Sequence, residues 1–244
     1  MILRQFLHND PVSISYMFGC GGKSTVAVVD PVADVDTYLE AAKMANVNIN
    51  YVIDTHVHAD HISTGRALAD AAGAEYVMSE RADLNLPFTP VRDGDEIPLG
   101  NVTIKILATP GHTPEHIPLL VTDRTRAEEP WLLLTGHTLM VGDLGRTELA
   151  VSAEQGAKDL FQSVQKLKAL PDYIQILPGA FSGSVCGRRL SGNPISTLGY
   201  ERRHNKAFAV DSEADFVEFM LQEIPPAPIE AATLRAINSG RARG

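Results

Sequence analysis

The chain has 244 residues, of which 44% are hydrophobic and 21% are charged, and its formal net charge is −9. These proportions are ordinary for a soluble globular protein, and the length is enough for a substantial core. The acidic balance argues against nucleic acid as a partner, because phosphate binding rests on clustered Lys and Arg. The two cysteines, Cys20 and Cys186, are too few for a disulfide scaffold.

The apolar segments bear on location and domain organisation. The first residues lack the apolar core of a signal peptide, and no apolar run reaches the roughly 18 residues that a membrane span needs. We therefore expect a cytoplasmic protein without a membrane partner. No Pro/Gly/Ser-rich linker divides the sequence, so we predict a single domain over residues 1–244, with an irregular tail over about 225–244.

Alternating and helix-period apolar patterns divide the chain into short elements. In chain order we predict a hairpin over 12–30, a helix over 33–45, a strand over 50–56, a helix over 63–73, a strand over 75–79, a hairpin over 96–111 that turns at Gly100–Asn101, strands over 117–123 and 131–137, a helix over 153–169, a strand over 173–179 and a helix over 211–223. Strands come in runs with helices between them. This order favours an α/β (α+β) fold of layered sheets with outer helices over a doubly wound parallel sheet.

Six of the eight histidines lie in three short motifs, 56-HVHADH-61, 112-HTPEH-116 and the single His137. Each motif follows an apolar strand, and loop ends on a rigid scaffold are where functional sites are built. In an extended segment His56 and His58 point to the same side, because side chains alternate, so both imidazoles can face one ion. Asp60 and His61 follow at the turn. The arrangement predicts a metal site.

These motifs resemble those of the metallo-β-lactamase superfamily over almost the whole chain. Within it, the chain is most similar to the persulfide dioxygenases, also called sulfur dioxygenases, and to their relatives fused to rhodanese domains. Glyoxalase II shares the first motifs but lacks the late block. The stretches that carry the similarity are 28-VVDPVADVDTY-38, 54-DTHVHADHIS-63, 111-GHTPEHI-117, 142-GDLGRTEL-149, 183-GSVCG-187 and 196-STLGYERRHN-205. The resemblance implies an αββα sandwich of two mixed sheets with outer helices, and a metal site along one sheet edge.

The resemblance also implies roles for single residues. In persulfide dioxygenases one Fe(II) is held at three positions, which here are His56, His112 and His137. His58 is implied to lie beside the metal, as a ligand or as a hydrogen-bonding neighbour. Asp60 and His61 occupy positions that help to bind a second ion in the dinuclear hydrolases. In a dioxygenase we expect these two residues to handle protons or to orient the ligands.

The chain departs from the family pattern at two positions. His137 stands where the family has the aspartate of a TGD motif, and Ala180 replaces a late histidine ligand. A neutral imidazole bridges two cations poorly and Ala180 offers no donor, so we expect no dinuclear hydrolase site. Three neutral histidines leave the site with one more positive charge than a set of two histidines and one carboxylate. We expect Fe(II), with Zn(II) as the alternative.

A thiol tripeptide such as glutathione carries two carboxylates, and the guanidinium fork of arginine suits carboxylate recognition. Arg146 is the first candidate for substrate binding, and Arg202, Arg203 and the pair Arg188–Arg189 follow. Cys186 matches a cysteine that is often present in the rhodanese-fused relatives. It would accept or pass on a sulfane sulfur if it were exposed with a lowered pKa, and the alternative is a buried structural thiol.

Together these features predict a mononuclear iron dioxygenase that oxidises a low-molecular-weight persulfide, such as glutathione persulfide, to sulfite. One alternative is a zinc hydrolase of a thioester or lactone, and another is a degenerate, metal-poor module that binds thiols. The expected partners are the persulfide, O2 and a separate sulfurtransferase, because 244 residues leave no room for a rhodanese domain. A homo-oligomer is implied by the resemblance.

Overall fold

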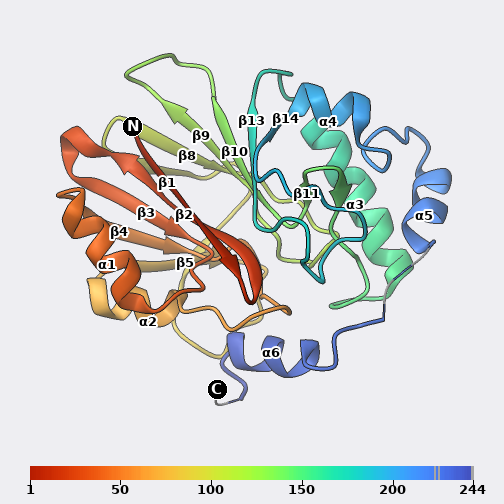
Figure 1. The fold of residues 1–244 in the computed structure, drawn as a ribbon, viewed down its shortest axis with the longest axis horizontal. Helices are drawn as coiled ribbons and strands as arrows, with labels where there is room; N and C mark the ends of the chain where they lie inside the picture. The colour runs from red at the N-terminus through yellow and green to blue at the C-terminus, as the bar shows by residue number, and fades with distance from the viewer. Residues whose placement is uncertain (223, 225, 243–244) are drawn as a thin grey trace.

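Two six-stranded sheets form the centre of the computed structural model, which describes residues 1–222, 224 and 226–242 (Figure 1). The first sheet consists, in spatial order, of β1 (Ile2–Asn9), β2 (Val12–Cys20), β3 (Thr25–Val29), β4 (Asn48–Ile53), β5 (Glu75–Ser79) and β6 (Thr89–Val91). The second consists of β14 (Ser196–Thr197), β13 (Gln175–Pro178), β10 (Leu132–Gly136), β9 (Leu119–Asp123), β8 (Val102–Ile106) and β7 (Glu96–Leu99). Both sheets are mixed, because β3 to β6 pair in parallel, as do β10 and β13.

Helices cover the outer face of each sheet (Figure 1). The first sheet carries α1 (Val35–Met44) and α2 (Gly65–Ala72), and the second carries α3 (Ala153–Lys168), α4 (Leu198–His204) and α5 (Glu213–Leu221). A short pair of strands, β11 (Leu139–Met140) and β12 (Asp143–Leu144), follows β10, and α6 (Ala231–Asn238) lies apart from both helix groups. The fold is therefore the predicted αββα sandwich. Among the described residues, no helix combines the length and apolar character that crossing a membrane requires.

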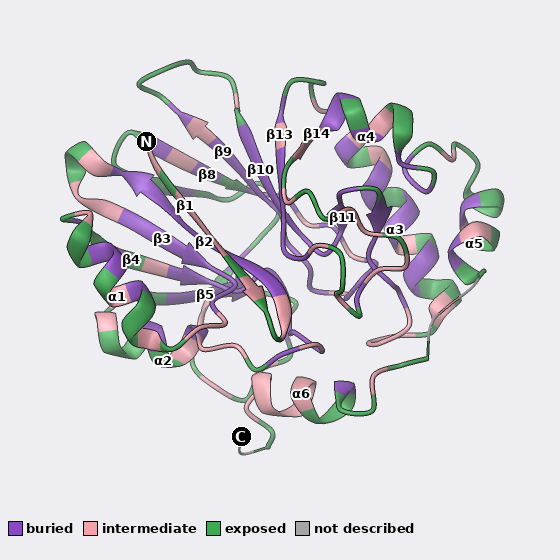
Figure 2. Ribbon diagram, viewed as in Figure 1, coloured by how far each residue is buried: buried purple, intermediate pink, exposed green. Residues whose placement is uncertain are grey.

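The alternation of side chains along the strands explains the layers. In β2, Tyr16 and Phe18 face the second sheet, whereas Met17 packs with Tyr38 of α1 on the opposite face. In β10, Leu132 and Leu134 face the first sheet, whereas Leu133 packs against the helices that cover the second sheet. Figure 2 shows the result as buried strands with exposed residues on the outer sides of the helices. Each fully buried large apolar side chain contributes about 1.5–3 kcal/mol to folding.

Most predicted elements are confirmed within a few residues, but the C-terminal tail is a correction. Residues 231–238 form α6 instead of an irregular segment, and residues 225, 243 and 244 of the predicted tail lie outside the described residues. The sequence AATLRAIN contains good helix formers, but the prolines before it obscured the pattern. The apolar patterns also missed β1, β6, α4 and the short strands β11, β12 and β14.

Tyr38 connects α1 to the loop that follows β3. Its hydroxyl accepts hydrogen bonds from the backbone N–H groups of Val32 (2.9 Å) and Ala33 (3.1 Å), and lies 2.7 Å from Ser15 Oγ. We predict that Tyr38→Phe lowers the free energy of unfolding by about 1–3 kcal/mol, because it leaves these groups without their partner. Urea unfolding measures this. The control Tyr173→Phe alters an exposed tyrosine and should change stability little, and equal unfolding midpoints for the two variants would contradict the prediction.

Candidate metal centre

Three loops bring the predicted ligands to one edge of the sandwich. The loop after β4 carries His56, His58, Asp60 and His61, the loop between β8 and β9 carries His112, and His137 follows β10 directly. The turn at His137 requires Gly136, which has φ +50°. A Cβ at this glycine would lie 2.5 Å from His116 Nε2 and 2.7 Å from Thr55 Oγ1, so a larger residue would displace the neighbouring loops.

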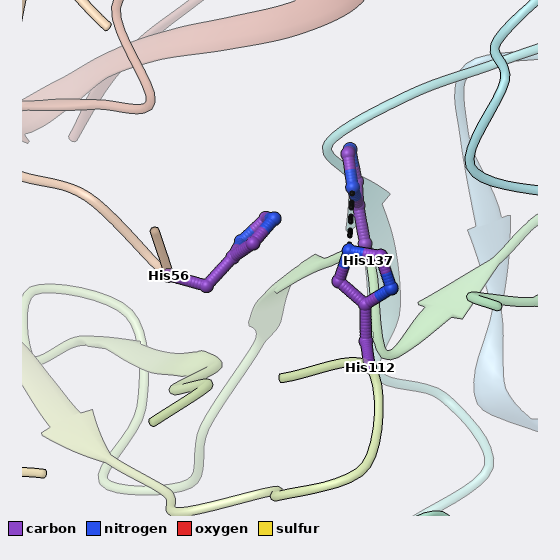
Figure 3. A group of neighbouring side chains, drawn as sticks. All are labelled: His56, His112 and His137. Carbon is purple, nitrogen blue, oxygen red and sulfur yellow. Dashed lines mark hydrogen bonds between the residues drawn. The ribbon is translucent and has the colours of Figure 1, made fainter. Parts of the chain in front are cut away.

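Three histidines, His56, His112 and His137, form the first group of donors (Figure 3). One ring nitrogen from each lies within 4.8 Å of the other two. His137 Nδ1 is 3.3 Å from His112 Nε2, and the His56 ring points toward this pair. All three side chains are buried. The spacing and the chemistry of the donors suit one transition-metal ion.

A second group lies beside the first and consists of His58, Asp60 and His61. His61 Nδ1 is 3.1 Å from Asp60 Oδ1, and His137 Nε2 is 3.9 Å from Asp60 Oδ2, so Asp60 is the member of the second group that approaches His137 of the first. The structure does not place His58 within the first group, although its ring centroid is 4.2 Å from that of His56. Its role as a direct ligand therefore stays a prediction.

Hydrogen bonds to the other ring nitrogens fix the orientation of the first group. Thr55 Oγ1 lies 2.9 Å from His56 Nδ1 and itself donates to Asp30. His112 Nδ1 donates to the backbone oxygen of Arg146 over 2.7 Å, which leaves Nε2 of His112 as the acceptor atom. Such contacts set the tautomer of a metal-binding histidine and aim its free lone pair.

Several buried atoms of the site have no hydrogen-bond partner of acceptable geometry within the described residues. They are His56 Nε2, His58 Nδ1, both carboxylate oxygens of Asp60 and both ring nitrogens of His61. Unpaired buried polar atoms are costly, and a cation satisfies several lone pairs at once. The residues present therefore fit a bound metal ion.

The electrostatics separate neutral from charged donors. Burial lowers the pKa of His56 and His116 well below 6.5, and burial together with His137 lowers the pKa of His112 to about 3. Burial would also lower the pKa of His58, but Asp30, 3.2 Å from Nε2, raises it to about 9. Burial opposes ionisation of Asp60, yet the neighbouring histidines hold its pKa well below 3.8. The first group is thus neutral and ready to bind a cation, beside an ionised Asp60.

The predicted substrate-binding arginines pair with nearby carboxylates, and among them Arg146 also contacts the centre through its backbone oxygen, which accepts from His112. Arg146 is buried and pairs with Glu148, and Arg202 and Arg203 of α4 both reach Asp172, which lies between α3 and β13. Their role in substrate binding stays a prediction. The further candidate Arg188 pairs with Asp143 at 3.1 Å and stacks on Phe219, and the backbone N–H of Arg189 donates to Asp143.

Cys186 does reach the centre, where its sulfur belongs to a group with Asp60 and His137. The side chain is fully buried, and burial, followed by the charge of Asp60, raises the pKa of the thiol well above 9. Cys186 is therefore not the exposed thiol with a lowered pKa that sulfur transfer would require.

Sequence reasoning missed residues that form hydrogen bonds with the backbone of the ligand residues. The ring of His116 accepts the backbone N–H of His137 at Nε2 (3.0 Å) and contacts Thr138 Oγ1 at Nδ1 (2.9 Å). From α6, Asn238 donates to the backbone oxygens of His58 (2.9 Å) and His61 (2.8 Å). His116 stood in a visible motif, but no local signal linked α6 to a loop 180 residues away.

Comparisons with known proteins identify the family of the chain. The model of the metallo-beta-lactamase superfamily matches residues 10–179, so the chain belongs to this superfamily. A crystal structure of a metallo-beta-lactamase from Staphylococcus aureus is similar with a TM-score of 0.93 and 36% identity, over 99% of this chain and 73% of that one. Human mitochondrial persulfide dioxygenase ETHE1 is 29% identical over 90% of this chain and 80% of its own length. Hydroxyacylglutathione hydrolase of Rhodospirillum rubrum is 27% identical over 89% and 91%.

The buried histidines predict a stability maximum of the metal-free protein near neutral pH. Below pH 6.5 only the unfolded chain protonates His56, His112 and His116, so stability falls on acidification. Above pH 6.5 the folded chain retains the proton of His58 up to about 9, so stability also falls as the pH rises through this window. Each uncompensated proton changes the unfolding free energy by about 1.4 kcal/mol per pH unit. Chemical denaturation across this range measures the curve, and unchanged stability on acidification below pH 6.5 would contradict it.

Asn238 should affect metal retention without being a ligand. Its side chain also accepts the N–H of Ser63 (2.9 Å), so Asn238→Ala removes three hydrogen bonds from the loop that carries His56, His58, Asp60 and His61. We predict that metal affinity falls by about 10–100-fold, as for other groups that orient ligands. Competition with a chromophoric chelator measures this, with Asn48→Ala as a control on an exposed residue. Equal affinity for both variants would show that α6 does not position the loop.

Proposed function

We propose that the protein is a dioxygenase that oxidises a low-molecular-weight persulfide with one iron ion at His56, His112 and His137. The observation that carries the proposal is a buried group of three imidazole donors without a bridging carboxylate. The similarity to persulfide dioxygenase ETHE1 over most of both chains supports the same reaction. Three imidazoles leave coordination positions for two further ligands, which a reaction of a thiol compound with O2 requires.

The reaction balances without a further cofactor. Glutathione persulfide, O2 and water give glutathione, sulfite and two protons, so the outer sulfur is oxidised and O2 is reduced. Iron, when bound, would let sulfur and O2 bind side by side and would carry electrons between them.

We propose cytoplasmic persulfide as the substrate and, as partners, a separate sulfurtransferase and a second copy of the chain.

The protein residues supply orientation, proton handling and exclusion of water. Thr55 and the backbone of Arg146 hold the rings of His56 and His112 in the orientation that presents their free nitrogens. Asp60 and His61 lie in contact beside the first group. The low pKa of Asp60 keeps its carboxylate ionised, so its role is to orient His61, and His61 is the group that handles the protons that the reaction releases. The side chains of both groups at the reacting position are buried, which keeps bulk water from the reacting sulfur. They are His56, His112, His137, Asp60 and His61.

A zinc hydrolase of a thioester or lactone is the second candidate. The similarity to hydroxyacylglutathione hydrolase favours it, as does the retained group of His58, Asp60 and His61. A metal-bound water would then be the nucleophile. The absence of a carboxylate at His137 and of a donor at Ala180 argues against it, because the hydrolase site then lacks its bridge. A metal-poor module that binds thiols is less favoured, because buried donors would stay unpaired.

Oxygen uptake tests the proposal directly. We predict that iron-loaded protein consumes O2 and forms sulfite when it receives glutathione persulfide, and that it does not hydrolyse a glutathione thioester. His137→Asp should lower the rate of oxygen uptake at least about tenfold, equivalent to about 1.4 kcal/mol, because the added negative charge disfavours an anionic sulfur ligand. Absence of uptake with bound iron would exclude the dioxygenase, and thioester turnover by zinc-loaded protein would then establish the hydrolase.

A further inference from the structure

The two large sheets of the sandwich have four edge strands, and three of these carry features that prevent pairing with another strand. β14 has two residues, β6 has three residues with Pro90 at its centre, and β7 has four residues that include Pro98. Short edge strands and prolines are devices by which proteins keep a sheet edge from pairing with another chain. The fourth edge strand, β1, has neither of these features (Figure 1).

β1 is a long, regular strand with one unused side. All eight residues, Ile2–Asn9, pair with β2 in one continuous register without a bulge, and Arg4 is the only lysine, arginine, aspartate or glutamate among them. Within the part of the chain that the structure describes, no hydrogen bond joins the backbone of β1 to a group outside β2. The backbone N–H and C=O groups on the outer side of β1 are therefore available to a further strand.

Two leucines of β1 are exposed on the face of the sheet that elsewhere forms the core. Leu3 is 39% exposed and Leu7 is 50% exposed. The residues opposite them in β2, Phe18 and Ile14, are buried in the core between the sheets. Because directly opposite residues lie on the same face of a sheet, the leucines continue this apolar face beyond the cover of the second sheet. Exposed leucines beside an open sheet edge are typical of an interaction surface.

From these observations we infer that β1 is a dimer interface, at which the β1 strands of two copies of the chain pair antiparallel about a twofold axis at Gln5. In this register Leu3 lies opposite the partner's Leu7, and Leu7 lies opposite the partner's Leu3. The first sheets of the two copies then form one continuous sheet. The inference specifies how the second copy, proposed above as a partner, binds, and it does not depend on the reaction at the metal centre.

The residues of β1 are complementary to themselves in this register. Arg4 lies opposite the partner's Phe6 and not opposite another arginine, so like charges do not meet. An axis one residue further along, at Phe6, would place Arg4 opposite the partner's His8 and each leucine opposite a polar side chain. The pairing about Gln5 is therefore the one that brings the leucines together.

The residue on the proposed axis is already fixed within its own chain. The side-chain amide of Gln5 donates to the backbone oxygen of Pro194 (3.2 Å) and to the hydroxyl of Tyr16 (3.3 Å). No polar group of Gln5 is thus drawn out of water by the pairing without a partner of its own. Because a surface that binds its own copy closes at two subunits, the dimer covers the one long edge strand that the described residues leave open.

Sedimentation equilibrium tests the inference without substrate or turnover, so its outcome is independent of the proposed oxidation. We expect a dimer in the unaltered protein. Leu7→Lys places on β1 the charge that protects other edge strands, and it should raise the dimer dissociation constant at least about tenfold. The control Leu221→Lys alters a leucine of α5 that is 38% exposed, and it should leave the dimer unchanged.

Cysteine variants test the register. Directly opposite residues of antiparallel strands have Cα atoms about 4.5–5.5 Å apart, which a disulfide can span. We expect a mild oxidant to cross-link a mixture of Leu3→Cys and Leu7→Cys proteins, or the double variant. Neither single variant alone should cross-link, because its two cysteines lie about 13 Å apart along the strands. The natural cysteines, Cys20 and Cys186, are buried and should not react.

The outcomes that would overturn the inference concern both the dimer and its register. A monomeric unaltered protein would overturn it, and so would a dimer whose affinity Leu7→Lys leaves unchanged. A dimer that cross-links in Leu7→Cys alone, or that fails to cross-link in the mixture and in the double variant, would show that the copies do not meet at β1 about Gln5.

Discussion

Burial of metal donors without hydrogen-bond partners is the constraint on which the rest of the structure depends. Imidazole nitrogens and carboxylate oxygens that leave water cost free energy unless something replaces the lost hydrogen bonds. At the edge of the two sheets, His56, His58, Asp60 and His61 leave such atoms unpaired, and no protein group among the described residues reaches them with good geometry. A bound cation would remove this cost by satisfying the unpaired nitrogen and oxygen atoms. The rest of the fold holds these atoms in place for such an ion.

The surrounding elements hold these donors in place. Asp30, which follows β3, accepts from the backbone and side chain of Thr55 and from His58. On the other side, Arg235 and Asn238 of α6 donate to backbone oxygens of the loop after β4. The loop is thus fixed from the sheet and from the C-terminal helix. The bonds to the Asp30 carboxylate and from the Arg235 guanidinium involve charged groups, and such hydrogen bonds are stronger than neutral ones.

Part of the fold and site followed from the sequence because their signals are local. The alternation in β2 and β3, the glycine turn at Gly100 and the amphipathic α3 each lie within one segment, and so does the HxHxDH motif. The contacts of Asn238 and the approach of Cys186 to His137 join segments far apart in sequence, and no periodicity encodes them. For the same reason Arg202 was a plausible carboxylate binder in the sequence, whereas its side chain also donates to the backbone oxygens of Lys168 and Leu170.

His137 in place of an aspartate sets the charge of the metal centre, because it removes a negative charge and adds a neutral imidazole ring. X-ray absorption spectroscopy of protein loaded with one equivalent of iron tests this most directly, because scattering from imidazole rings identifies histidine ligands. We predict a nitrogen and oxygen shell with the signature of three imidazoles, which falls to two in His137→Asp. Fewer than three imidazoles in the unaltered protein, or an unchanged number in the variant, would contradict a site built on His56, His112 and His137.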